Sequence, residues 1–179
     1  QALPLYEEAE RISREPWEQG WAALGVAEAQ AELGDAEAAS AALDTLRAHS
    51  DPEVRMQASI RRSQLAAIAE DWETAISALP SSDTDAMGAA WDASATGARA
   101  GALMGAGDPD GAEAAYRALA KRWPDDEEGY LPAWLGLAQL AQTEGDEAEA
   151  HRWARKAFRG ASDPGYKQQA RDMVRDLAD

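Results

Sequence analysis

Few residues in this sequence have the types and spacing that catalysis or metal binding requires. The two histidines, His49 and His151, lie in distant parts of the chain, and neither has a nucleophile close by in sequence. Gly107–Gly111 (GDPDG) opens like a calcium loop, but Ala112 and Leu119 stand where that loop needs further oxygen ligands. The chain contains no cysteine, which excludes thiolate ligands and cysteine nucleophiles. We therefore expect no catalytic residue, no metal site, no cofactor and no enzymatic activity.

Other groups of residues leave alternatives open. Paired acids, such as Asp125 and Asp126, lie in predicted turns and are expected to be solvated. A run of glycines recurs every four residues on one helix face, which allows close packing, an open groove wall or the approach of a ligand: Gly97, Gly101, Gly105. Four cations share the face of a later helix, as a solvated outer surface or a site for an acidic partner: Arg152, Arg155, Lys156, Arg159.

The composition favours an all-α protein and restricts its partners. Alanine dominates the apolar residues, and stretches rich in β-branched residues are few. The net charge of −16 repels nucleic acid and anionic membranes. Up to Tyr116, 7 basic and 21 acidic residues give a net charge of −14, whereas 10 basic and 12 acidic residues from Arg117 onward give −2. A basic partner is therefore expected to be drawn to the N-terminal two thirds of the chain.

No segment of this chain has the pattern of a membrane anchor or a signal peptide. No apolar run approaches the length that a membrane-spanning helix needs, so we expect no direct membrane insertion. The sequence leaves open whether the protein is cytoplasmic or belongs to the periplasm or cell envelope. It also leaves the oligomeric state open.

A turn followed by a helix start recurs four times. Its aspartates, Asp35, Asp71, Asp108 and Asp146, are spaced by 36, 37 and 38 residues, and glycine precedes three of the four. A glycine there ends one helix in a left-handed conformation, and the aspartate caps the next helix. Asp146 and Glu149 together predict a capping box. A period of this length predicts a repeat protein with two helices per unit.

The repeats resemble the tetratricopeptide repeat family. The last unit carries the family's pattern best, with large, small and turn residues at the matching places: Trp134, Leu137, Ala138, Ala141, Gly145, Ala150, Ala154, Ala157. The resemblance implies an all-α, right-handed superhelical solenoid of antiparallel helix pairs. We predict ten helices, near residues 3–14, 17–33, 36–49, 53–69, 72–79, 84–106, 109–122, 128–143, 147–159 and 164–178, with a loop at Pro80–Asp85.

We predict a single repeat domain over residues 1–179, without a linker. A leading helix of an incomplete repeat (1–16) is followed by helix pairs at 17–50, 51–80, 83–124 and 126–160, and by a capping helix at 163–179. Pro4–Pro16 has the pattern of a second helix without its first, so we expect that repeats or another segment precede Gln1 in the natural protein. The amphipathic segment Asp163–Asp179 is expected to lie near a natural end.

In the family that this chain resembles, the first helix of each pair lines a concave groove where peptides or partner domains bind. The resemblance places twelve residues of this chain in such a groove: Trp21, Leu24, Glu28, Glu32, Ile60, Gln64, Gly97, Gly101, Met104, Leu135, Gln139, Gln142. Some members clamp the C-terminal carboxylate of chaperones with lysines and asparagines. Those basic residues are missing at the matching positions here, so we expect no such binding.

The expected function is therefore a protein–protein interaction scaffold, with a partner that is neutral to basic and has apolar anchors. One alternative comes from Arg117–Ala150, which is similar to repeats of bacterial cell-envelope proteins such as the Tol-Pal-associated coordinator of cell division and outer-membrane assembly lipoproteins. That likeness implies a periplasmic assembly or cell-division scaffold. Another alternative is the repeat domain of a larger enzyme or sensor whose activity lies upstream of Gln1.

Overall fold

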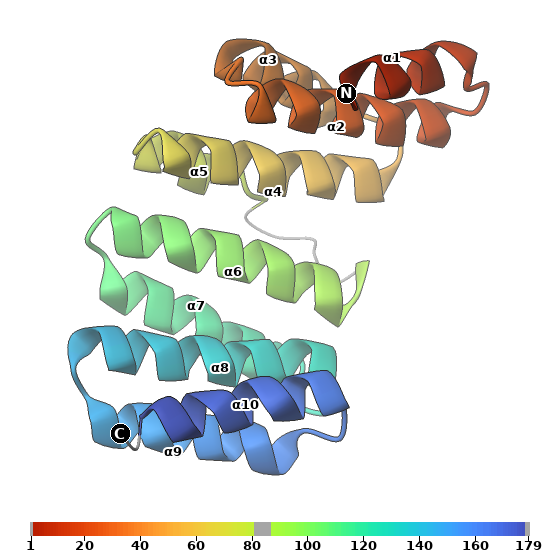
Figure 1. The fold of residues 1–179 in the computed structure, drawn as a ribbon. Helices are drawn as coiled ribbons and strands as arrows, with labels where there is room; N and C mark the ends of the chain where they lie inside the picture. Colours follow the sequence, from red (N-terminus) through yellow and green to blue (C-terminus); the bar gives the residue numbers. More distant parts are fainter. Residues whose placement is uncertain (1, 81–86, 178–179) are drawn as a thin grey trace. The chain divides into compact units, whose positions relative to one another are not determined.

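The computed structural model describes residues 2–80 and 87–177, and within these ranges every element is a helix (Figure 1). This described part of the chain contains ten helices, the number that the sequence predicts, so the all-α helical repeat is confirmed. They are α1 (Leu3–Ile12), α2 (Pro16–Glu32), α3 (Ala36–Leu46), α4 (Pro52–Ile68), α5 (Trp72–Ser77), α6 (Ala89–Gly105), α7 (Pro109–Arg122), α8 (Glu127–Glu144), α9 (Glu147–Gly160) and α10 (Pro164–Asp176).

The helices form two compact units, residues 1–83 with α1–α5 and residues 84–179 with α6–α10. The single domain over 1–179 and the right-handed superhelix stay predictions. Apart from Pro80, the predicted loop Pro80–Asp85 lies outside the described residues, as does the predicted helix start at residue 84. The sixth helix begins at Ala89, because the φ of Gly88 is +92°, which a helix cannot contain.

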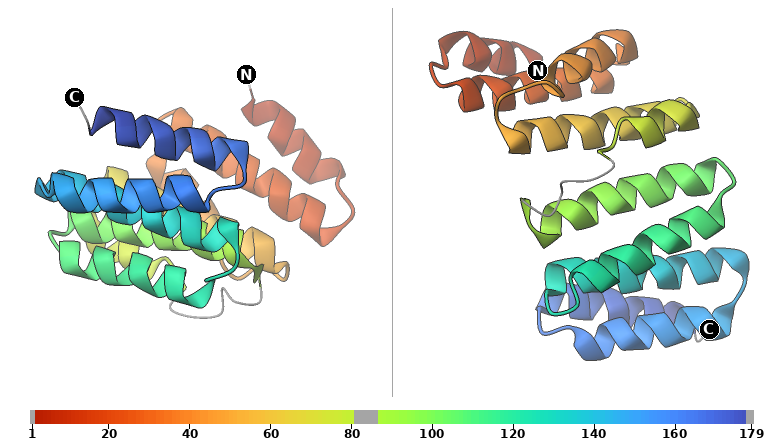
Figure 2. Two further views of the ribbon diagram at one scale, coloured as in Figure 1. Left: turned by 90° about the horizontal axis from the view of Figure 1, so that it is seen from below. Right: turned by 180° about the vertical axis from the view of Figure 1, so that it is seen from behind.

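Within each unit, neighbouring helices along the chain pack against each other, and so do the first helices of successive pairs. In the first unit α2 contacts both α3 and α4, and in the second α6 contacts both α7 and α8. α10 lies against α9 (Figure 2). Its role as a capping helix stays a prediction. This pattern of contacts is that of stacked helix pairs, in which each pair buries its apolar face against the next.

The recurring turn has the same hydrogen bonds at all four places. The backbone N–H of Asp35, Asp71, Asp108 and Asp146 donates to the carbonyl oxygen five residues earlier, at 2.9 Å in each case. The carboxylate of each aspartate then accepts the N–H three residues later, at 2.9–3.1 Å. The predicted turn and helix caps are therefore confirmed: one short motif ends the first helix of a pair and begins the second.

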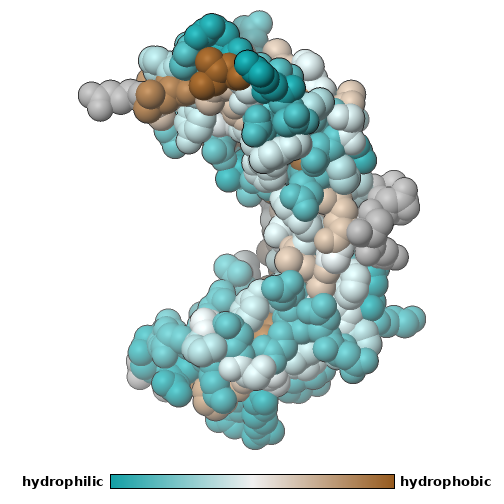
Figure 3. Space-filling model, turned by 90° about the vertical axis from the view of Figure 1, so that its right-hand side faces the viewer, coloured by the Kyte–Doolittle hydropathy of each residue, from teal (hydrophilic) through white to brown (hydrophobic). Residues whose placement is uncertain are grey.

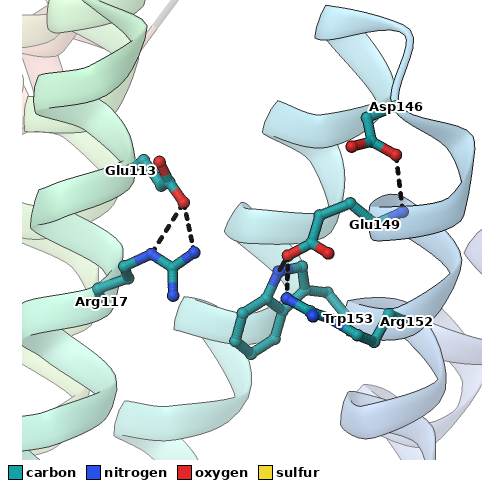
Figure 4. A network of polar contacts seen from close by, with 6 residues as sticks. All are labelled: Glu113, Arg117, Asp146, Glu149, Arg152 and Trp153. Carbon is teal, nitrogen blue, oxygen red and sulfur yellow. Dashed lines mark hydrogen bonds and ion pairs between the residues drawn. The ribbon is translucent and has the colours of Figure 1, made fainter.

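The predicted capping box at Asp146 and Glu149 is wrong. A box requires the Glu149 carboxylate to accept the backbone N–H of Asp146. That N–H already donates to the carbonyl oxygen of Ala141 in the preceding turn. The Glu149 carboxylate instead accepts hydrogen bonds from the side chains of Arg152 and of Trp153, whose indole nitrogen lies 2.7 Å away (Figure 4).

The second turn contains a strained residue, which gives a first stability prediction. Glu70 has a φ of +58° where the other three turns have glycine. Because a left-handed conformation is unfavourable for a residue with a Cβ, Glu70→Gly should raise the free energy of unfolding by about 1 kcal/mol, measured by urea denaturation. The reverse exchange, Gly34→Glu, should lower it by a similar amount. A loss of stability in Glu70→Gly would contradict the prediction.

Both histidines have structural contacts. His49 was predicted at a helix end, but α3 ends earlier, at Leu46, and His49 lies in the turn before α4. Its Nδ1 accepts the backbone N–H of Asp51 at 3.1 Å, and its carbonyl oxygen accepts a bond from Arg55. The Nε2 of His151 lies 2.8 Å from the carbonyl oxygen of Leu177 and therefore donates to it, which ties α9 to the end of α10.

Two equivalent glycines set the packing of successive helices. A Cβ at Gly25 of α2 would lie 2.4 Å from the ring of Tyr6 on α1, and a Cβ at Gly136 of α8 would lie 2.4 Å from the ring of Tyr116 on α7. In each case a tyrosine of the preceding helix covers the glycine face. This close approach positions Tyr116 at the edge of a cavity in the second unit.

Candidate partner-binding cavities

The first unit has a cavity of about 380 Å³ between α2 and α4, which we name the α2–α4 cavity. Helices α2 and α4 each contribute four of its residues, and α3 contributes one. Its walls combine small and large apolar side chains with two carboxylates, one amide and one guanidinium: Ala27, Glu28, Ala31, Glu32, Leu43, Arg61, Gln64, Leu65, Ile68.

Charged and apolar groups alternate along the α2–α4 cavity. Arg61 Nη2 lies 2.6 Å from Glu28 Oε1 and connects the two walls. The carboxylate of Glu32 forms no hydrogen bond or ion pair with any residue within the two described ranges. Ile68 leaves 82% of its surface exposed. The cavity therefore offers a free carboxylate, a partly exposed ion pair and an exposed aliphatic side chain within one unit.

The second unit has a similarly placed cavity of about 330 Å³ between α6 and α8, the α6–α8 cavity. Its described lining has no charged residue: Gly97, Ala100, Gly101, Met104, Tyr116, Gly136, Gln139, Leu140, Thr143. Burial raises the pKa of the Tyr116 hydroxyl, so this group stays protonated and can donate a hydrogen bond at neutral pH. Apart from the neighbouring backbone of α6 itself, no described atom would lie within 4 Å of a Cβ at Gly97 or Gly101.

The structure brings together seven of the twelve residues predicted for the groove. Glu28, Glu32 and Gln64 line the α2–α4 cavity, and four others line the α6–α8 cavity: Gly97, Gly101, Met104, Gln139. Trp21 is 38% exposed and Gln142 is exposed, but neither is among the lining residues. A continuous groove across all the repeats stays a prediction.

Three of the predicted groove residues belong to the core instead. Leu24, Ile60 and Leu135 are only 4%, 5% and 5% exposed, so a partner cannot reach them. Leu24 packs with Leu43 and other buried residues, and Leu135 packs in a cluster of the second unit. These aliphatic side chains are needed to bury the helix faces, and the wall of each cavity begins on an adjacent face of the helix.

Sequence reasoning missed lining residues on both cavities, including Arg61, Leu65, Ile68, Tyr116 and Thr143. A signal for three of them was present. Arg61 stands three residues before the predicted Gln64, and Ile68 stands four after it, so all three share one face of α4. The same spacing from Gln139 identifies Thr143.

The basic face of α9 is partly covered by aromatic contacts. Lys156 Nζ lies 4.3 Å from the ring centre of Trp134 and 4.8 Å from that of Trp153. Arg152 lies 5.3 Å from the Trp153 ring and pairs with Glu149 (Figure 4). Contacts within the chain therefore already hold Lys156 and Arg152. This favours the interpretation of the basic face of α9 as a solvated outer surface over its interpretation as a binding site for an anion.

Hydrophobic surface is concentrated in the first unit. On the face shown in Figure 3, brown surface gathers over α1–α3. The large hydrophobic side chains that are exposed in the described ranges all belong to this unit: Leu5, Tyr6, Ile12, Trp17, Trp21, Leu33, Ile68. Among the helices that the structure describes, none is both long and apolar enough to cross a membrane.

Comparison with known proteins identifies the family of this chain. Residues 7–132, well over half of the sequence, match the family model of the tetratricopeptide repeat-like domain. This match covers α2–α7 and the start of α8, and therefore includes the whole α2–α4 cavity. A search of the curated proteins found no match. The helix pairs, the recurring turn and the family model agree, and the chain belongs to the tetratricopeptide repeat-like family.

Proposed function

We propose that this protein acts by binding rather than by catalysis, as an interaction module for another protein. Its α2–α4 cavity receives a neutral-to-basic segment that carries an apolar anchor. The observation that supports this proposal is the meeting, in one cavity, of the free Glu32 carboxylate and the exposed Ile68 side chain. Peptide recognition by helical grooves commonly uses such a combination of an apolar anchor and a charged contact.

The apolar and the charged groups of the cavity contribute to binding in different ways. Covering an exposed isoleucine contributes up to about 1.5–3 kcal/mol, so Ile68 supplies affinity. Charges at an exposed rim contribute less affinity and act more on specificity and on the association rate. The net charge of −16 attracts a basic segment before it is bound.

Heteronuclear NMR titration with a short peptide tests the proposal. The probe is acetylated and amidated, and it carries one lysine and one leucine in a glycine–serine background. Peptides with lysine replaced by glutamate, or leucine by serine, serve as counterparts. We expect shifts at the cavity residues with the first peptide. Each counterpart should bind about tenfold more weakly, equivalent to about 1.4 kcal/mol.

A pair of variants separates binding in the cavity from general attraction to an acidic protein. Glu32→Lys should weaken the binding of the lysine peptide about tenfold, because it places a cation at the rim of the cavity. Glu10→Lys makes the same change of net charge on α1, outside the cavity, and should leave the affinity within about twofold. Equal weakening by both variants, or shifts spread over the whole chain, would contradict the proposed site.

A further inference from the structure

We propose that Arg61 determines the specificity of the α2–α4 cavity by acting as an internal competitor. Its guanidinium pairs with Glu28, one turn from the free Glu32 on the same wall of the cavity, and a ligand's cation that contacts both carboxylates must displace it. This inference rests on the proposed function, because it assigns a role to one residue of the same cavity. It adds a criterion by which the cavity selects among ligands.

The contacts of Arg61 place its charge where a ligand's cation would bind. The side chain starts on α4 and reaches Glu28 on α2, with Nη2 2.6 Å from Oε1. Nη1 donates to Oε1 of Gln64 at 3.3 Å. The closest atoms of the ion pair with Glu28 are Nη2 and Oε1, so the charge of the guanidinium lies directly on that carboxylate. Arg61 therefore neutralises a carboxylate that a ligand's cation could otherwise contact.

The pair has the properties of an exchangeable contact. Arg61 and Glu28 keep 41% and 44% of their side-chain surface exposed, and ion pairs in such positions contribute little to stability. The Nε of Arg61 is buried and has no hydrogen-bond partner among the residues that the structure describes, which is unfavourable for a charged group. Water can solvate the guanidinium once it leaves Glu28. Releasing Arg61 thus has a small cost that a ligand can offset.

This competition makes the cavity selective for a two-part ligand. A lone cation gains only a contact with Glu32 at the exposed rim, which contributes little, and on Glu28 it exchanges one ion pair for another. A ligand that also covers Ile68 obtains the additional apolar contribution. Arg61 and Ile68 are seven residues apart on α4, which is about 10 Å along the helix axis. In an extended segment, about three residues span that distance, so the cation and the anchor should be three positions apart.

The test compares Arg61→Gln with a matched control on the neighbouring residue. Arg62 lies on the same helix and pairs with Asp44 at 3.3 Å, but it does not line the cavity. Arg62→Gln therefore removes the same charge from α4 without exposing Glu28. The probe is a capped peptide with lysine and leucine three positions apart, and its dissociation constant is measured by NMR titration. Circular dichroism confirms the helical content of each variant.

Arg61→Gln should bind this peptide about fivefold more tightly than the unmodified chain, and Arg62→Gln should stay within about twofold of it. Arg61→Gln should also bind a peptide without leucine, because the competitor is gone. Arg61→Lys keeps a cation beside Glu28 and should stay close to the unmodified chain. Weaker binding by Arg61→Gln would show that Arg61 contacts the ligand, and would overturn the inference.

The result also separates this inference from the proposed function. If the unmodified chain binds the peptide in the cavity and Arg61→Gln binds it equally well, the competitor role is wrong and the binding function stands. If neither protein binds any of the peptides, both proposals are wrong. If both arginine variants bind more tightly by the same factor, the effect comes from net charge, and the specific role of Arg61 is overturned.

Discussion

Replacing Leu131 by alanine is expected to lower the free energy of unfolding by about 3 kcal/mol. Leu131 is 0% exposed and lies at the centre of a cluster in which α8, α9 and α10 meet. The neighbours in that cluster are held by their own helices, so the lost side chain leaves a cavity that they cannot easily fill. Urea denaturation followed by tryptophan fluorescence measures the effect, because Trp134 packs against the same cluster.

The control is a truncation of an exposed aliphatic residue. Ile68→Ala removes a side chain that is 82% exposed and should change the free energy of unfolding by less than about 0.5 kcal/mol. The same substitution should instead weaken the binding of the leucine peptide. A loss below about 1 kcal/mol in Leu131→Ala would mean that the three helices do not share a tightly packed core.

The second large effect is expected at Asp92, a buried carboxylate on α6. Its Oδ2 accepts hydrogen bonds from Arg122 Nη1 at 2.7 Å and from Trp123 Nε1 at 2.8 Å. The Asp92 side chain is 4% exposed, whereas that of Arg122 is 43% exposed. In Asp92→Ala, the indole N–H of Trp123 loses this acceptor at a partly buried site. We expect a loss of about 2–3 kcal/mol, measured by thermal and urea denaturation.

Two further variants identify the cause of that loss. Asp92→Asn keeps an oxygen acceptor for Trp123 and should lose only about 1 kcal/mol. Arg122→Ala removes a cation that reaches solvent and should lose less than about 1 kcal/mol. If Asn were as damaging as Ala, the negative charge would matter more than the hydrogen bond to Trp123. An unchanged stability in Asp92→Ala would show that the buried carboxylate does not hold α6 to the end of α7.

Much of this fold follows from the sequence because its defining contacts are local. Each recurring turn is closed by hydrogen bonds between residues three to five apart, so Gly34 and Asp35 by themselves determine where α2 ends and α3 begins. The same reasoning identified the degenerate turn at Glu70, whose backbone has the left-handed conformation despite the missing glycine. The number of helices in the described residues was predictable for the same reason.

The tertiary structure alone decided which faces of these helices meet. The sequence placed Leu24, Ile60 and Leu135 in a groove, but a rotation of a helix by a fraction of a turn exchanges core and surface, and all three are buried. The pairing of Arg61 with Glu28 joins residues 33 positions apart, and that of Asp92 with Arg122 joins residues 30 apart. Such contacts depend on how two helices cross, which no short sequence motif specifies. The sequence therefore determined the repeating helix pairs, and packing decided the chemistry of the cavities between them.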